Sequence, residues 1–195
     1  MKRFFDLAFC IIFGPIILVV CLILSIILIL SQGFPILFQQ NRAGLNGRSF
    51  KIIKFRTMLA NTSNKNTQFD AGNNSRVTFV GKYLRACKLD EFPQIWNVFI
   101  GEMSMVGPRP EVEYWTKKFP EKWAKIHTVK PGITDPGSIK FRHEEKILQN
   151  AEDPEEEYLN RILPEKLKIY EDYVDNCNIY NDFKIIVKTI YVLFR

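Results

Sequence analysis

The stretch "LAFCIIFGPIILVVCLILSIILIL", Leu7–Leu30, carries no charged residue and limits how the rest of the chain can be arranged. At ~1.5 Å per residue, a straight helix over this run would be about 36 Å long, enough to cross a bilayer core of roughly 30 Å. The run is too long for the apolar part of a cleaved signal peptide, and no small-residue cleavage site follows it. We therefore predict a membrane-embedded helix within residues 1–33.

The Gly14–Pro15 pair predicts that this helix is not straight. Pro15 has no N–H to donate, and its ring crowds the preceding turn, so a kink is expected there. A kinked helix could cross the bilayer, or a broken helix could enter and return to the same face. Basic residues favour the cytoplasmic side, and both flanks are basic: Lys2 and Arg3 precede the run, and Arg42–Arg56 follows it. The flanks favour a re-entrant helix and a cytoplasmic position for the remaining chain.

Residues 34–178 have the pattern of one α+β domain that is predominantly helical. Short strands are predicted at Ile36–Gln40 and Ser49–Phe55, and Asn46–Gly47 between them is a hairpin turn signal. Strands and helices do not alternate, so a doubly wound sheet is not indicated. The other predictions are a loop at Asn61–Ser75, helices at Phe79–Cys87, Asp90–Ile100 and Leu163–Val174, a helix that starts near Pro110, a turn at Lys130–Gly137, and an acidic helix start at Glu152–Glu157.

Residues 179–195 predict an amphipathic C-terminal helix of the same domain. Its apolar residues recur with helical spacing, and Lys184 and Lys188 lie on the other side. Such a helix can lie in the membrane interface or pack on the domain core, and the pattern leaves both open. The apolar positions are Phe183, Ile186, Val187, Ile190, Tyr191 and Phe194.

The charge distribution favours an anionic partner. The formal net charge is +6, and no acidic residue lies between Asp6 and Asp70. Lipid headgroups or a phosphorylated substrate fit such a region, whereas nucleic acid fits poorly because the basic stretch adjoins the apolar run. The four cysteines show no paired spacing, and His127 and His143 show no zinc spacing.

Two adjacent acids, Asp90 and Glu91, stand in "LRACKLDEFPQIW", Leu84–Trp96. The structural interpretation is a helix start, with Asp90 as N-cap and Glu91 and Pro93 in the first turn. The same position suits chemistry, because a helix N-terminus favours an ionised carboxylate. One acid could then act as a nucleophile while the other holds a hard cation such as Mg²⁺.

Two arginines near these acids would suit a diphosphate substrate. Arg85 lies five residues before Asp90, and Arg109 stands between Pro108 and Pro110, which restrict the backbone on both sides. Arginine forms bidentate pairs with phosphate oxygens. Each arginine alone is also typical of a surface residue or a structural ion pair.

Three ordered motifs after the apolar run resemble those of the monotopic phosphoglycosyl transferases. They are "NRAGLNGRSFKIIKFRTM", "LRACKLDEFPQIWNVFIGEMSMVGPRP" and "VKPGIT", and the likeness covers almost the whole chain. These bacterial enzymes start glycan assembly on a polyprenol phosphate such as undecaprenyl phosphate. The resemblance implies a re-entrant N-terminal helix in the inner membrane, a catalytic domain on its cytoplasmic face, interfacial amphipathic helices, and a role in the synthesis of O-antigen, capsule, exopolysaccharide or glycoprotein glycans.

The resemblance also implies roles for single residues. Asp90 would attack the sugar-linked phosphorus of a UDP-sugar, UMP would leave, and polyprenol phosphate would attack the aspartyl-phosphosugar intermediate. Glu91 would hold Mg²⁺, and Lys54, Arg85 and Arg109 would hold phosphates. Many members continue the Pro-Gly-Ile-Thr motif with Gly-Trp, whereas Thr134 is followed here by "DPGSIKFRHEE". Arg142 in that segment is a further candidate substrate contact.

Two other functions are compatible with parts of the pattern. A glycosyltransferase that moves a sugar without its phosphate would usually carry a D-x-D motif and a nucleotide-binding α/β sheet, and the sequence indicates neither. A non-catalytic membrane adaptor that binds anionic lipid would need only the apolar run and the basic patch. The oligomeric state stays open, a homo-oligomer included.

Overall fold

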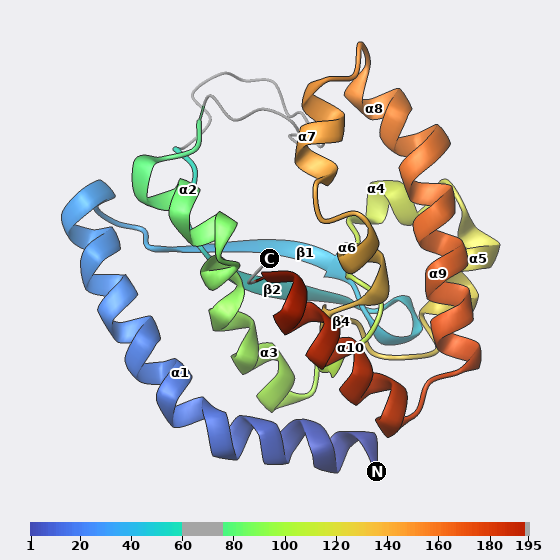
Figure 1. Ribbon diagram of the computed structural model, residues 1–195, viewed down its shortest axis with the longest axis horizontal. Helices are drawn as coiled ribbons and strands as arrows, with labels where there is room; N and C mark the ends of the chain where they lie inside the picture. The colour runs from blue at the N-terminus through green and yellow to red at the C-terminus, as the bar shows by residue number, and fades with distance from the viewer. Residues whose placement is uncertain (60–75, 194–195) are drawn as a thin grey trace.

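The computed structural model describes residues 1–59 and 76–193, so the loop predicted at Asn61–Ser75 lies outside the described residues, as does Phe194. The described chain is predominantly helical and carries two small sheets (Figure 1), which confirms the predicted α+β class. The elements in order are α1 (Lys2–Gln32), β1 (Leu37–Ala43), η1 (Leu45–Gly47), β2 (Ser49–Phe55), α2 (Phe79–Ala86), η2 (Leu89–Gln94), α3 (Ile95–Ile100), β3 (Ser104–Val106), α4 (Glu113–Thr116), α5 (Pro120–Ile126), β4 (Gly132–Thr134), α6 (Pro136–Lys140), α7 (Glu144–Gln149), α8 (Pro154–Glu157), η3 (Tyr158–Ile162), α9 (Leu163–Asp175) and α10 (Ile179–Leu193).

Helix α1 contains the whole apolar run and continues through Pro15 without a break. Figure 1 shows that it bends and passes along one side of the molecule, next to α2 and α3. Within the described residues it is the one helix long and apolar enough to cross a membrane, and most of that surface is exposed. The predicted kink therefore takes the form of a bent, continuous helix.

Polar contacts hold the N-terminal end of α1 on the domain. Arg3 donates to the carbonyl oxygens of Val98 and Phe99 at the end of α3, at 2.5 and 2.7 Å. The buried Asp6 carboxylate accepts hydrogen bonds from Ser104 Oγ and from the N–H of Met105, both at 2.9 Å. These contacts join the start of α1 to α3 and β3.

The last turn of α1 is held by the same domain. Gln32 Nε2 donates to the carbonyl oxygen of Arg56, and the Arg56 guanidinium donates to the carbonyl oxygens of Gln32 and Gly33. Leu28 is fully buried against Phe55 and Leu84. Both ends of the apolar helix thus contact one compact body.

The predicted hairpin is confirmed. Strand β2 has the predicted bounds, and β1 pairs with it in antiparallel register from Leu37 opposite Phe55 to Ala43 opposite Ser49. The turn needs backbone that most residues avoid, because Asn46 and Gly47 both have positive φ, at 54° and 72°. The sequence prediction ended β1 three residues early.

A small parallel sheet was not predicted. Val106 of β3 pairs with Thr134 of β4, and Ser104 pairs with Gly132, in the segment where the sequence indicated only a turn. The strands are three residues long, too short to show an alternating pattern. Glycine is required on both sides, since a Cβ at Gly132 would lie 2.1 Å from the backbone nitrogen of Gly107.

The prediction of a helix that starts near Pro110 is wrong: α4 begins only at Glu113, after an extended segment.

The larger apolar core lies among the helices of the C-terminal half. Helix α9 supplies Leu163, Leu167 and Tyr170 and packs on α5 through Trp123 and Ile126. The predicted helix at residues 163–174 is confirmed, and the acidic stretch begins α8 as predicted, capped by Asp153. This core supports α6 and so fixes the segment that follows Thr134.

Helix α10 packs on the domain and still exposes an apolar face. Asp182, Ile185, Ile186 and Thr189 face the domain, with the Asp182 carboxylate accepting a hydrogen bond from Tyr173 at 2.7 Å. Of the apolar residues in the predicted pattern, Phe183, Val187, Ile190 and Tyr191 are each at least half exposed. Packing on the domain core is thus confirmed for one face of α10, and the other face is apolar and exposed, as a helix in a membrane interface requires.

Candidate active site

Asp90 and Glu91 lie on the 3₁₀ turn η2, which leads directly into α3. The predicted single helix from Asp90 to Ile100 is thus two elements, although Gly101 ends α3 with a positive φ as expected. Asp90 is not the N-cap: Lys88 holds that position in the left-handed region, with φ of 57°. The bend at Lys88 turns the two acids inward, and both are buried.

Glu91 is the centre of a cluster of buried charges. Its Oε1 accepts a hydrogen bond from Lys54 Nζ at 2.8 Å and one from Arg109 Nη2 at 2.7 Å. Lys54 comes from β2, and Arg109 comes from the extended segment after β3. Asn97 of α3 fixes β2 beside the turn that carries Glu91, because its side chain accepts from the N–H of Ile53 at 3.2 Å and donates to the carbonyl oxygen of Lys51 at 2.8 Å.

The pKa shifts in the cluster follow from burial and from these ion pairs. Burial alone would raise the pKa of Glu91, but Arg109 and Lys54 outweigh it and hold that pKa well below its usual range. Glu91 raises the pKa of Arg109 well above its ordinary value. Burial lowers the pKa of Lys54, with Glu91 acting in the opposite direction. Glu91 is therefore ionised at neutral pH and is stabilised by the fold.

Asp90 has the opposite electrostatic character. Burial and the adjacent Glu91 raise the pKa of its carboxyl, while Lys54, Lys88 and Arg109 act against that rise. Burial and Glu91 thus oppose the effect expected of a helix N-terminus, which favours the ionised carboxylate. Asp90 Oδ1 is buried and makes no hydrogen bond to any described residue, and the same holds for the amide nitrogen of Gln94 on the same turn. Unpaired buried polar atoms are rare, and a catalytic role or a bound ion or water is a common reason for them.

The two outer arginines lie away from this cluster. Arg85 on α2 forms an ion pair with Glu145 of α7 rather than with either acid of η2. Arg142 is exposed in the turn between α6 and α7, without an ion pair to the part of the chain that the structure describes. The Arg85–Glu145 pair joins α2 to the segment that carries Arg142. The structure thus gathers Asp90, Glu91, Lys54 and Arg109, with Arg85 and Arg142 on neighbouring elements.

The site offers oxygen ligands for Mg²⁺ but no complete protein cage. Within the described ranges no group of three metal-binding side chains occurs. Asp90 Oδ1 is free of protein partners among the described residues, and Glu91 Oε2 has only a 3.5 Å contact with Arg109. Mg²⁺ is commonly held by one or two carboxylates together with substrate phosphates and water. The donor set fits a cation of that kind.

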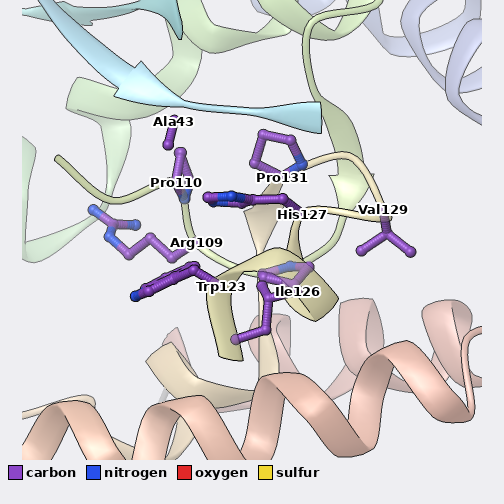
Figure 2. Close-up of a pocket in the computed structure, with 9 residues that line it drawn as sticks. Ala43, Arg109, Pro110, Trp123, Ile126, His127, Val129 and Pro131 are labelled. Carbon is purple, nitrogen blue, oxygen red and sulfur yellow. The ribbon is translucent and has the colours of Figure 1, made fainter. Parts of the chain in front are cut away.

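A small cavity lies behind Arg109 and is not the substrate site (Figure 2). It offers about 10 Å³ to the centre of a water molecule, roughly the space of one water. Trp123, Ile126 and His127 line it, and burial lowers the pKa of His127. Figure 2 shows the guanidinium of Arg109 pointing away from His127. The contact of Arg109 with Glu91 therefore lies outside this cavity.

Sequence reasoning missed three residues that shape the site. Lys88 turns the chain into η2 and adds positive charge near both acids. Gln94 is 1% exposed, and Asp135 is fully buried. No sequence pattern predicts that a lysine adopts the left-handed backbone conformation. For Asp135 a signal did exist, because it stands where many family members have Gly-Trp.

The domain thus combines a long apolar helix, held at both ends, with two buried acids that face the cations Lys54 and Arg109. The chain belongs to the bacterial sugar transferase family, whose model matches residues 1–195. It is 32% identical over 195 residues to a UDP-N-acetylgalactosamine-undecaprenyl-phosphate N-acetylgalactosaminephosphotransferase of Aeromonas hydrophila. It is 31% identical over 182 residues to a UDP-glucose:undecaprenyl-phosphate glucose-1-phosphate transferase of Caulobacter vibrioides.

The matched relatives differ in length. The comparisons cover 97% and 91% of this chain but only 43% and 62% of the Aeromonas and Caulobacter proteins. The uncharacterized sugar transferase EpsL of Bacillus subtilis is 34% identical over 190 residues, and there the match covers 97% of this chain and 85% of the relative. The chain thus spans about half the length of some relatives and most of another.

Proposed function

We propose that this protein transfers a sugar-1-phosphate from a UDP-sugar to a polyprenol phosphate such as undecaprenyl phosphate and releases UMP. The observation that carries the proposal is a buried carboxylate with a free oxygen, Asp90, beside an acid already neutralised by Lys54 and Arg109 within the described residues. The names of the relatives from Aeromonas and Caulobacter supply the substrate classes. The reaction would be the first membrane step of bacterial glycoconjugate synthesis.

The proposed chemistry has two displacements at one phosphorus atom. An Asp90 carboxylate oxygen attacks the sugar-linked phosphorus of the UDP-sugar, a P–O bond forms, and the bond to the UMP oxygen breaks. A phosphate oxygen of the polyprenol phosphate then attacks the same phosphorus, and the Asp90 carboxylate leaves. The raised pKa of Asp90 supports this role, since a carboxylate with little solvation and few partners is a better nucleophile than one held in ion pairs.

The buried cations would bind the diphosphate. Arg109 can form bidentate bonds with phosphate oxygens, and Lys54 supplies a second positive charge within 2.8 Å of the same Glu91 oxygen. Arg85 and Arg142 lie farther out, where they would contact the remainder of the substrate. When bound, Mg²⁺ would neutralise developing charge on the phosphates. Its protein ligands would be Glu91 and Oδ1 of Asp90, which has no hydrogen-bond partner among the described residues.

The arrangement of α1 supports a re-entrant helix, and its basic flanks favour a site on the cytoplasmic face of the inner membrane. A straight helix of 31 residues would be about 46 Å long, so its ends would lie on opposite sides of a bilayer. Here Asp6 binds β3 at one end, and Gln32 binds Arg56 beyond β2 at the other. One folded domain cannot hold both ends across a membrane. The exposed apolar residues of α10 would lie in the same interface.

Nucleotide release tests the proposed reaction and separates it from its alternatives. We expect the purified chain to release UMP when it receives both a UDP-sugar and undecaprenyl phosphate, measured across a panel of UDP-sugars. A glycosyltransferase that moves the sugar alone would release UDP. A lipid-binding adaptor would release neither nucleotide. Either of these two results across the whole panel would contradict the proposal.

Cysteine labelling tests the topology of α1. In a variant without the native cysteines, one cysteine is inserted after Met1 or replaces the exposed Asn41. Because both ends of α1 contact one domain, we expect no reaction of either site with an impermeant thiol reagent in intact cells. Both should react after permeabilisation. A site that reacts from outside while the other does not would show that α1 spans the bilayer.

A further inference from the structure

The segment Asp135–Ser138 is the part of the sequence that departs from the family pattern, and the parallel sheet places it beside Arg109. Val106 pairs with Thr134, and the N–H of Gly107 donates to the carbonyl oxygen of Thr134 at 3.1 Å. Gly132 in turn donates its N–H to the carbonyl oxygen of Pro108 at 3.0 Å. Asp135 therefore follows β4 directly, and Arg109 follows the end of the neighbouring strand β3.

Asp135 is buried to an unusual degree for a residue that caps a helix. Its side chain accepts from the N–H of Ser138 at 2.7 Å and from Ser138 Oγ at 2.5 Å. No part of it is exposed, whereas Asp153, which caps α8 before a proline in the same way, lies at the surface. Capping alone does not require burial, and burying a carboxylate is costly unless a positive charge compensates it.

Tyr170 of α9 completes the surroundings of Asp135. The Tyr170 hydroxyl and the Asp135 carboxylate both lie against Gly137, and burial followed by the charge of Asp135 raises the pKa of Tyr170 well above its ordinary value. Glycine is needed at position 137, since a Cβ there would lie 2.9 Å from both Asp135 Oδ1 and the Tyr170 oxygen. The Asp-Pro-Gly-Ser segment is thus built around an aspartate–tyrosine pair.

Arg109 is the cation that connects this pair to the site. Asp135 makes no ion pair with any residue in 1–59 and 76–193, so its charge is not neutralised by a direct contact there. After Glu91, the charge of Asp135 also raises the pKa of Arg109, and Tyr170 acts in the same direction. Arg109 therefore lies in the field of two acids, one inside the proposed reaction site and one outside it.

We propose that Asp135, held by Tyr170, is a positioning residue that keeps Arg109 in place when a substrate phosphate takes over its contact with Glu91. The inference rests on the proposed function of Arg109 as a phosphate ligand. Binding of a diphosphate brings negative charge to the Glu91 side of the guanidinium. Asp135 would supply a fixed anion at the β3–β4 ladder, so that the guanidinium of Arg109 stays oriented.

Asp135→Asn tests the proposal, with UDP as the probe and the full chain in detergent or nanodiscs. Asparagine is about as good an N-cap as aspartate, so the substitution removes the charge and retains the cap. We expect UDP to bind about tenfold more weakly by calorimetry, within the range of indirect effects on a binding site. The KM for the UDP-sugar should rise in parallel, with kcat changed less than KM.

Asp153→Asn is the matched control, because it makes the same change at an Asp-Pro helix start far from the cluster. It should leave UDP binding unchanged.

In an Arg109→Lys background, Asp135→Asn should have little further effect, since coupled residues are not additive. If Asp135→Asn does not fold, Tyr170→Phe should weaken UDP binding in the same direction. Wild-type UDP affinity in a folded Asp135→Asn or Tyr170→Phe variant would overturn the inference, and so would a full additive loss in the Arg109→Lys background. Because the readout is UDP binding, this result is independent of whether UMP release is observed.

Discussion

Replacement of Asp90 by asparagine should abolish turnover and leave the chain folded. The amide is not a nucleophile toward phosphorus, so we expect UMP release to fall by about 10⁴-fold or more, as in enzymes that lose a covalent catalyst. Stability should not fall, because burial and Glu91 raise the pKa of Asp90. A raised carboxyl pKa means that the fold disfavours the charged form at neutral pH, and the neutral amide of Asp90→Asn removes that charge.

The midpoint of thermal unfolding should therefore be equal to or higher than that of the wild type at pH 7. The advantage should disappear at a pH low enough to protonate Asp90 in both folded and unfolded chains. Measurement of nucleotide release and thermal unfolding on the same preparation separates a chemical defect from a folding defect. A folded variant with substantial turnover would contradict the assignment of Asp90.

Replacement of Glu91 by glutamine should also lose activity, with the opposite effect on stability. Glu91 is paired with Lys54 and Arg109, and these cations hold its pKa well below its usual range. A lowered carboxyl pKa contributes stability above the unfolded pKa of about 4.3 and loses it as the pH falls. Glu91→Gln should therefore be less stable than the wild type at pH 7, and the difference should shrink as the solution is acidified.

The loss of activity in Glu91→Gln should be on the order of 10²-fold or more, because the site loses the acid that orients Lys54 and Arg109 and that would bind Mg²⁺. Turnover of the wild type should require Mg²⁺ and should stop in excess EDTA. To separate metal binding from orientation, UDP affinity is measured with and without Mg²⁺ in both proteins. We expect Mg²⁺ to strengthen UDP binding in the wild type and to have little effect in Glu91→Gln. Equal strengthening of UDP binding in both proteins would show that Glu91 does not bind the metal. Full turnover in excess EDTA would show that the reaction does not need Mg²⁺.

The sequence predicts well those features that depend on local pattern. The apolar run, the hairpin with Asn46–Gly47, the helix at 163–174 and the cap at Gly101 are all set by residues close to one another in the chain. Lys54 was proposed as a phosphate ligand from the family resemblance, and Arg109 also from its place between two prolines; the structure places both against Glu91.

Features that depend on tertiary contacts were not predictable. The parallel pairing of Val106 with Thr134 joins strands of three residues, which leave no period to read. The N-cap was assigned to Asp90 because aspartate is favoured there, yet Lys88 adopts the left-handed conformation and the acids turn inward. Burial then reverses the pKa shift that an exposed helix end would give Asp90, because desolvation outweighs a partial dipole charge.

The covalent role of Asp90 is tested most directly by intact-protein mass spectrometry after incubation with a UDP-sugar that supports turnover, without any polyprenol phosphate. The proposed mechanism predicts that the wild type gains the mass of one phosphosugar and releases one equivalent of UMP. The adduct should map to the peptide that contains Asp90, should be absent in Asp90→Asn, and should disappear when undecaprenyl phosphate is added. An adduct on another residue, or UMP release that requires undecaprenyl phosphate and never leaves an adduct, would contradict it.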